Sequence, residues 1–280
     1  MMEQTPPPPI YRFDEEKHIH YLKGKRVPGV STISKLAEDS SRPLMYWAVN
    51  MVVQCLGKNT RYEEGQIVFH NPANDTDLLL NEENYKSIFA YAKKEHEREK
   101  DNAADRGTRV HSILEKYFLD EPYEVEPDIQ KSVDAFLEWV EKFKVRPLFT
   151  EQTVYSLKHN YAGIFDLGAV ITAQDGERKL LIDFKTSKSV YISHMVQSAG
   201  YKIAHEEMYG PTWDGLGILS LHPETGYPLW IDLTGYTEEL EQAFLSCLQL
   251  NEVMKPISRL RYKFKQELDK ALALLEDSKE

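Results

Sequence analysis

The sequence predicts an α/β or α+β fold in which helices pack on a central mixed β-sheet. Short apolar runs with strand-like composition follow one another between residues 152 and 233. Segments with apolar residues three and four positions apart, which is typical of amphipathic helices, precede and follow these runs. Hydrophobic residues make up 41% of the chain and charged residues 28%, as in ordinary globular proteins.

The first 56 residues predict a leader and a small N-terminal part. Residues 1–10 contain a run of prolines, so a disordered leader is expected there. Residues 11–27 predict two strands that turn at Lys23-Gly24-Lys25. Ser31 or Thr32 is the expected N-cap of a short helix through Leu36, and a second helix is expected over about 43–56.

The rest of the chain predicts one domain that continues to residue 280. Residues 57–82 are rich in Asn and Asp and predict a surface insertion within an N-terminal part, 11–104, of strands and helices. A core over 105–236 and C-terminal helices over 237–280 follow. The expected elements are helices from 83 through 118, over 128–143, over 193–208 and from 237 onward, and strands over 152–157, 162–172, 179–186, 216–221 and 229–233.

Composition excludes several classes of protein. The net charge of −11 argues against a passive protein that coats DNA through a broad basic surface. Two cysteines, Cys55 and Cys247, are too few for a four-cysteine iron–sulfur cluster or zinc site, and we expect two buried thiols. The N-terminus lacks the apolar segment of a secretory signal, and no membrane span is expected. We therefore expect a cytoplasmic protein.

One strand carries charges inside an apolar run. In the segment Leu-Ile-Asp-Phe-Lys-Thr-Ser-Lys, residues 181–188, Asp183 and Lys185 are two positions apart and share one face of the strand. Burying a carboxylate and an ammonium is unfavourable unless they are paired, hydrated or bound to a metal. This strand is therefore a candidate functional element.

The preceding strand adds a second carboxylate to the same face. Asp175-Gly176 is a strong hairpin signal, and a two-residue loop there places Asp166 opposite Lys185, with Asp183 as its diagonal neighbour. Three interpretations are open: a surface hairpin with ion pairs, a carboxylate pair for acid–base hydrolysis of glycosides, or a divalent-metal site. Only the metal site gives all three residues a role.

Two helical segments carry further polar pairs. His111 and Glu115 are four residues apart and therefore share a helix face, next to apolar positions. Gln197 and Tyr201 have the same spacing on the helix that follows the charged strand. Taken alone, each pair is also compatible with an ordinary helix boundary.

Together these residues resemble a known nuclease family. The ordered set is Gly107-x-x-x-His111-x-x-x-Glu115, Gly163-x-x-Asp166, Ile182-Asp183-Phe184-Lys185-Thr186 and Gln197-x-x-x-Tyr201. This set resembles the PD-(D/E)XK nuclease superfamily and, within it, the RecB-type exonuclease branch. Residues 28–32 (Pro-Gly-Val-Ser-Thr) and Trp47 are similar to segments of the mitochondrial genome maintenance exonucleases and their phage-encoded relatives. The resemblance covers roughly 28–56 and 105–233 and implies a restriction-endonuclease-like core.

The resemblance implies a role for each motif residue. Mg²⁺, or Mn²⁺ as a substitute, is expected on His111, Asp166, Asp183 and the backbone carbonyl of Phe184. Asp166, Asp183 and Lys185 form the catalytic set, in which Lys185 positions the attacking water and offsets charge in the transition state. The supporting residues are expected to be Glu115, Gln197 and Tyr201.

The resemblance also implies substrate and partners. The expected function is metal-dependent exonucleolytic hydrolysis of DNA, with a preference for free ends of single strands, in replication, recombination or repair. The candidate DNA-binding residues are Arg106, Arg109, Ser31, Thr32, Lys188 and Lys202. A recombination or single-strand-binding protein is a possible partner, and the location would be the bacterial host cytosol if the protein is phage-encoded. The alternative is a catalytically inactive DNA-binding or partner-binding module on the same fold.

Overall fold

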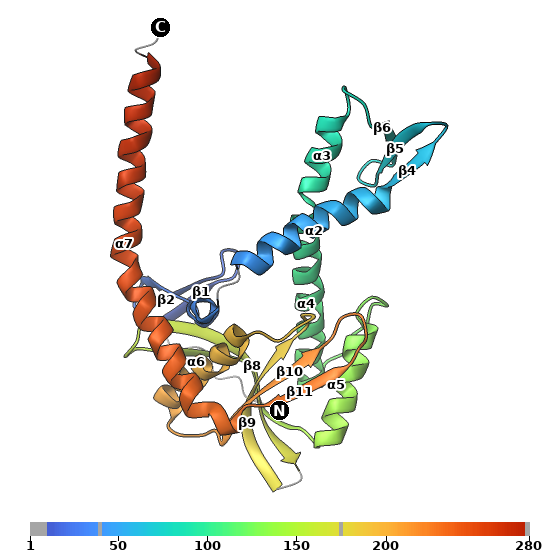
Figure 1. Cartoon of the computed structure of the whole chain (residues 1–280). Coiled ribbons are helices and arrows are strands. Elements are labelled where there is room, and N and C mark those ends of the chain that lie inside the picture. Colours follow the sequence, from blue (N-terminus) through green and yellow to red (C-terminus); the bar gives the residue numbers. More distant parts are fainter. Residues whose placement is uncertain (1–9, 39–40, 174–175, 278–280) are drawn as a thin grey trace. The chain divides into compact units, whose positions relative to one another are not determined.

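The computed structural model describes residues 10–38, 41–173 and 176–277. The predicted mixed fold of helices and sheets is confirmed (Figure 1). The chain forms two compact units, one of residues 1–38 with 113–280 and the other of residues 39–112. Residues 1–9 of the predicted leader lie outside the described residues.

The first unit is built on a five-stranded mixed sheet (Figure 1). Its strands are β7 (Arg146–Ser156), β8 (Tyr161–Ala173), β9 (Gly176–Lys185), β10 (Gly215–Leu221) and β11 (Pro228–Asp232), in the order β11-β10-β9-β8-β7. Only β9 and β10 pair in parallel, while the other neighbours are antiparallel. The parallel pair requires a crossover, and helix α6 (Ile192–Tyr209) provides it.

Two helices cover opposite faces of this sheet. Phe184 of β9 packs edge-on against Phe136 of α5 (Gln130–Phe143). Leu181 is three residues before Phe184 on the same strand and therefore points to the other face, where it belongs to the apolar cluster that contains Val196 of α6. Because side chains alternate along a strand, the odd-numbered residues of β9 face α6. The charged residues of this strand therefore point towards α6.

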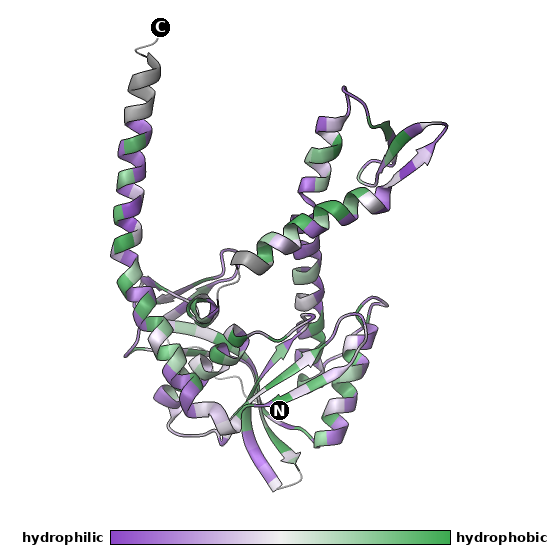
Figure 2. Ribbon diagram, viewed as in Figure 1, coloured by the Kyte–Doolittle hydropathy of each residue, from purple (hydrophilic) through white to green (hydrophobic). Residues whose placement is uncertain are grey.

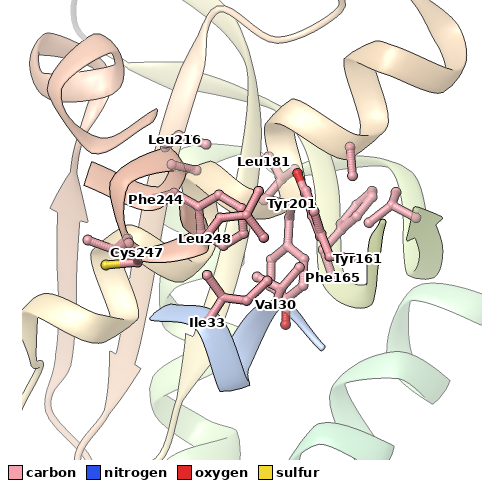
Figure 3. Close-up of a cluster of buried hydrophobic side chains, with 14 of the residues drawn as sticks. Val30, Ile33, Tyr161, Phe165, Leu181, Tyr201, Leu216, Phe244, Cys247 and Leu248 are labelled. Atoms are coloured by element: carbon pink, nitrogen blue, oxygen red, sulfur yellow. The ribbon is translucent and has the colours of Figure 1, made fainter. Parts of the chain in front are cut away.

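The apolar cluster beneath α6 forms the main core. Helix α1 (Val30–Ser34) contributes Val30 and Ile33, and helix α7 (Thr237–Asp277) contributes Phe244 and Leu248 (Figure 3). A short 3₁₀ turn, η1 (Lys35–Ala37), extends α1, in agreement with the helix predicted through Leu36. The backbone of Gly29 caps α1, so the predicted N-cap at Ser31 or Thr32 is wrong. Another 3₁₀ turn, η2 (Thr234–Tyr236), precedes α7.

The N-terminal strands form a separate small sheet of the first unit. Three strands are present instead of the predicted two: β1 (Tyr11–Asp14), β2 (Ile19–Leu22) and β3 (Lys25–Val27). The predicted turn after β2 is confirmed, and Lys23 and Gly24 both have positive φ there. The additional strand arises because the chain also reverses after Asp14.

The second unit contains helices and its own sheet. Its elements are α2 (Ser41–Asn59), β4 (Thr60–Glu63), β5 (Gln66–Asn71), β6 (Thr76–Leu79), α3 (Tyr85–Lys93) and α4 (Glu95–Leu119), the last of which continues into the first unit. The segment predicted as an insertion is therefore mainly a three-stranded antiparallel sheet. The single helix expected from residue 83 is two helices, because the chain leaves the helix at Lys94.

Helix α7 has two different halves. Its first half packs into the core through Phe244, Cys247 and Leu248. From Glu252 to Lys270 every residue is exposed. Figure 2 shows apolar and polar residues alternating along this exposed half. None of the helices in the described part of the chain has the length and apolar character that a bilayer span requires.

Candidate metal centre

The β8–β9 hairpin has a different register from the predicted one. Ala173 pairs with Gly176, so Gly176 belongs to a strand and not to the loop predicted at Asp175-Gly176. Gln174 and Asp175 lie outside the described residues. The predicted pairing of Asp166 with Lys185 is therefore wrong by two residues. A shift of two leaves each side chain on the same face, so the carboxylates still share one surface.

Asp166 is fixed beside Asp183. The register pairs Leu167 with Ile182, and one step further Asp166 lies opposite Asp183. The backbone N–H of Phe184 donates a hydrogen bond of 2.6 Å to Oδ2 of Asp166. This hydrogen bond orients the carboxylate next to β9.

Glu151 on β7 is a site residue that sequence reasoning missed. It lies between the pairs Thr150–Leu167 and Gln152–Phe165, which places it level with Asp166 on the neighbouring strand. Its φ of 45° is unusual for a residue other than glycine within a strand. Backbone strain of this kind is concentrated at functional sites. The available signal was an acidic residue one position before the predicted strand 152–157.

Glu151 and Asp166 form a group with His111. One ligand atom from each of the three side chains lies within 4.8 Å of the other two. His111 is on α4, shortly before this helix enters the first unit at Ile113. Two carboxylates and an imidazole are suitable donors for Mg²⁺ or Mn²⁺. The group includes His111 and Asp166 of the predicted ligands, adds Glu151, and does not include Asp183.

Asp183 and Lys185 begin a chain of polar contacts behind this group. Asp183 is only 1% exposed, and its Oδ2 is in an ion pair with Nζ of Lys185. Nζ of Lys185 also lies 3.5 Å from Oε1 of Gln197. The amide nitrogen of Gln197 donates a 2.6 Å hydrogen bond to the hydroxyl of Tyr201. The structure therefore links all four predicted residues, two from β9 and two from α6.

Tyr201 supports this chain from within the core (Figure 3). Burial raises the pKa of Tyr201 well above its usual value, and the nearby carboxylates of Asp183 and Asp166 raise it further. The side chain therefore stays a neutral phenol, whose oxygen accepts the hydrogen bond from Gln197. Tyr201 holds Gln197, and Gln197 contacts Lys185.

Two residues close to these groups have altered acidity. Burial, and then the positive charge of Lys185, lowers the pKa of His194 to about 4, so its imidazole is neutral at pH 7. Burial raises the pKa of Glu115, and Glu121 raises it further. Glu115 is half-buried one helical turn after His111 but does not belong to the three-residue group.

The predicted DNA-binding residues have different environments. Ser31 and Thr32 are exposed on α1. Lys188 is exposed and lies 2.5 Å from the carboxylate of Glu224. Arg106 and Arg109 are half-buried on α4 in the second unit, and Arg109 is 2.8 Å from the carboxylate of Asp105.

Lys202 does not fit its predicted contact with DNA. It is 9% exposed, and Nζ lies 2.7 Å from Glu206 and 2.8 Å from Glu241. Two carboxylates therefore already neutralise this ammonium, which joins α6 to α7. Glu206 is four residues after Lys202 on the same helix, whereas the pairing with Glu241 on α7 depends on the tertiary fold.

No protein-family model matches the chain, and no curated protein matches it in sequence. The chemistry of the site must therefore be inferred from its own residues.

Proposed function

We propose that this chain is a divalent-metal-dependent deoxyribonuclease that hydrolyses phosphodiester bonds with the site on β7, β8, β9 and α6. The arrangement of Lys185 is the observation that carries the proposal. This lysine lies between the buried carboxylate of Asp183 and the amide of Gln197, on the strand next to Asp166. A surface hairpin with incidental ion pairs does not require a buried carboxylate or the supporting amide and phenol.

The donor set fits a hard divalent cation. His111, Glu151 and Asp166 would hold Mg²⁺ or Mn²⁺, and the register of β8 with β9 places the carboxylate of Asp183 on the same face. When bound, such an ion neutralises charge on the scissile phosphate and makes a coordinated water more acidic. An iron–sulfur cluster is not part of the proposal, because the chain has only two cysteines.

The protein side chains contribute position and charge. Lys185 offers ammonium hydrogens to the attacking water and to a phosphate oxygen, where negative charge develops. Asp183 and Gln197 restrict the ammonium to one region, so that less side-chain freedom is lost when substrate binds. Tyr201 in turn keeps the amide of Gln197 in one orientation through its hydroxyl.

The resemblance to RecB-type nucleases supports a more specific proposal. The chain would have a restriction-endonuclease-like core and would act as an exonuclease on DNA, in replication, recombination or repair. The net charge of −11 argues against holding long duplex DNA over a broad surface. A flexible single strand needs fewer phosphate contacts and can gain affinity from base stacking.

An assay with end-labelled DNA tests the proposal. We expect the purified chain to degrade labelled single strands with Mg²⁺ and to be inactive with EDTA. Asp183→Asn, which keeps the shape of the side chain, and Lys185→Gln should each lower the rate at least 100-fold. Lys179→Gln, on the exposed part of the same strand, is the matched control and should retain the wild-type rate.

Thermal unfolding must accompany the assay, because removing one partner of a buried ion pair costs about 3–5 kcal/mol. Asp183→Asn and Lys185→Gln should still unfold cooperatively above the assay temperature. Folded variants with wild-type cleavage rates would contradict the proposal. Binding of DNA by the wild-type chain without any cleavage would favour the inactive module instead.

A further inference from the structure

The distal half of α7 carries an unpartnered apolar stripe. Seven large apolar side chains between residues 250 and 268 are between 43% and 59% exposed. They are Leu250, Val253, Met254, Ile257, Leu260, Phe264 and Leu268. Their spacings of three and four residues place them along one side of the helix, over about 27 Å at 1.5 Å per residue. A helical stripe of this kind normally packs against another apolar surface.

The surroundings of the stripe are strongly basic. Residues 253–266 contain five cations, Lys255, Arg259, Arg261, Lys263 and Lys265, and no acidic residue. This concentration contrasts with the net charge of −11 of the whole chain. By helical geometry, Arg261 and Lys265 lie one turn apart along one edge of the stripe. Among the described residues, the last four of these cations have no ion-pair partner, whereas Lys255 lies 2.5 Å from Glu252.

We propose that the stripe on α7, residues 250–268, docks an acidic amphipathic helix of a partner protein. Its apolar side would cover the stripe, and its carboxylates would lie beside Arg261 and Lys265. Amphipathic helices bind other helices through such anchors at three- and four-residue spacing, and complementary charges select the partner. This surface lies outside the candidate metal centre and does not depend on the proposed nuclease activity.

The charges disfavour a second copy of the chain as occupant. Two copies paired through this stripe would bring the same cation-rich segment, residues 253–266, against itself in an antiparallel arrangement centred on Leu260. A parallel arrangement would also place like charges beside each other. Like charges directly opposed across an interface are unfavourable.

The apolar residues favour a protein over a nucleic acid. Six of the seven side chains of the stripe are aliphatic or methionine, and Phe264 is the one aromatic. Single-stranded nucleic acid is held mainly by aromatic stacking together with cations, and aliphatic side chains offer no stacking surface. Tyr262 is also exposed but lies away from the stripe by helical geometry.

The test uses the full chain and designed helical peptides of about 28 residues, labelled with fluorescein. One peptide has Leu at positions a and d and Glu at e and g, and its matched control has Lys in place of Glu. Fluorescence anisotropy should show at least tenfold tighter binding of the Glu peptide. Ile257→Asn and Arg261→Glu should each weaken that binding at least tenfold. Lys25→Glu, an exposed charge reversal on β3, should leave it unchanged.

Three results would overturn the proposal. Equal binding of the two peptides would remove the charge argument. Preferential binding of a labelled single-stranded DNA 20-mer that is lost in Ile257→Asn would make the stripe a nucleic-acid surface. Concentration-dependent dimers in analytical ultracentrifugation that Ile257→Asn abolishes would identify a second copy as the occupant. The substituted side chains are solvent-exposed, so we expect each variant to fold. Circular dichroism checks this.

Discussion

Gly163 is a small residue at the point where the ring of Tyr201 approaches the sheet. A Cβ atom added at Gly163 would lie 2.6 Å from Cε1 of Tyr201 and 2.9 Å from Cγ2 of Val30. Both distances are far below ordinary van der Waals contact, so the ring would have to move. The absence of a side chain at Gly163 therefore allows the ring position in which Tyr201 accepts the hydrogen bond from Gln197.

This close approach leads to a prediction for Gly163→Ala. Overpacking of a core usually costs about 1–3 kcal/mol, so we expect a lower Tm for this variant. If the proposed nuclease function holds, displacement of Tyr201 should also reduce the cleavage rate more than it changes the KM for DNA. Gly57→Ala, where an added Cβ meets no atom within 4 Å, is the control. A destabilised Gly163→Ala enzyme with an unchanged rate would show that Tyr201 has only a packing role.

The proposed metal ligands can be tested one residue at a time. His111→Ala and Glu151→Gln should each raise the Mn²⁺ concentration for half-maximal activity by roughly 10-fold or more, because each removes one donor. DNA binding in EDTA should change little. Titration calorimetry with Mn²⁺ alone gives a readout that does not depend on turnover. An unchanged titration for Glu151→Gln would limit the site to the residues predicted from sequence.

Part of this site could be predicted from the sequence, because the side-chain repeat of a strand or a helix fixes which residues share a face. Asp183 and Lys185 share a face whatever the register, and Gln197 and Tyr201 share a face of any helix. Glu151 was not recognised, because its position depends on the antiparallel pairing of β7 with β8 and on a backbone conformation with φ of 45°. Sequence periodicity carries no signal for either feature.

At the scale of elements, α6 connects the site to the core. Gln197, Tyr201 and His205 follow one another at four-residue spacing, and Glu207 on the same helix binds the turn between β7 and β8. The carboxylate of Glu207 accepts hydrogen bonds of 2.9 Å from the backbone N–H groups of Leu157 and Lys158. From the helix α5 onward the order of the elements was predicted correctly, because each of them has a clear apolar pattern. The hairpin register was not, because it depends on which two residues form the loop.

The buried His205 on α6 should make the stability of the folded state depend on pH. It is 1% exposed, and neither ring nitrogen has a hydrogen-bond partner among the described residues. Its ring lies among those of Phe165, Trp213 and Tyr209. Burial lowers the pKa of His205 to about 4, although the nearby Glu206 opposes this effect.

Acid should destabilise the folded state through His205. The pKa of His205 is about 4 in the folded state and about 6.5 in the unfolded chain. The contribution of neutral His205 to stability is therefore complete above pH 6.5. The free energy of unfolding decreases as the pH falls from 6.5 to 4, because the unfolded chain binds a proton at this residue more readily. We expect His205→Phe to reduce this loss by roughly 1–2 kcal/mol. Urea unfolding at pH 7.5 and pH 5 measures it.

Other histidines also contribute to the pH dependence of the free energy of unfolding. His20 and His194 also have pKa values lowered to about 4, so the pH slope should decrease in His205→Phe rather than disappear. The same slope in His205→Phe as in the wild type would assign the acid sensitivity to other groups.

For the whole molecule, the charge balance leads to a prediction about substrate topology. The 34 cations of the chain are outnumbered by 45 acidic residues, which disfavours a broad duplex surface, whereas a free single strand needs only a local basic track. We therefore expect rapid degradation of linear single-stranded DNA, and rates at least 10-fold lower for circular single strands and blunt duplexes. Matched linear and circular oligonucleotides incubated with Mg²⁺ provide the measurement. Equal rates on both forms would identify an endonuclease.

The polar chain from Asp166 to Tyr201 belongs to one continuous stretch of sequence. Asp166 and Phe184 are 18 residues apart, and Lys185 and Gln197 are 12 apart. Closing such short loops loses little chain entropy, so these contacts can form early in folding. Glu151 is 15 residues from Asp166 and joins it through the β7–β8 pairing, whereas His111 precedes Glu151 by 40 residues. In pulsed hydrogen exchange during refolding, amides of β8, β9 and α6 should therefore become protected before those of α7.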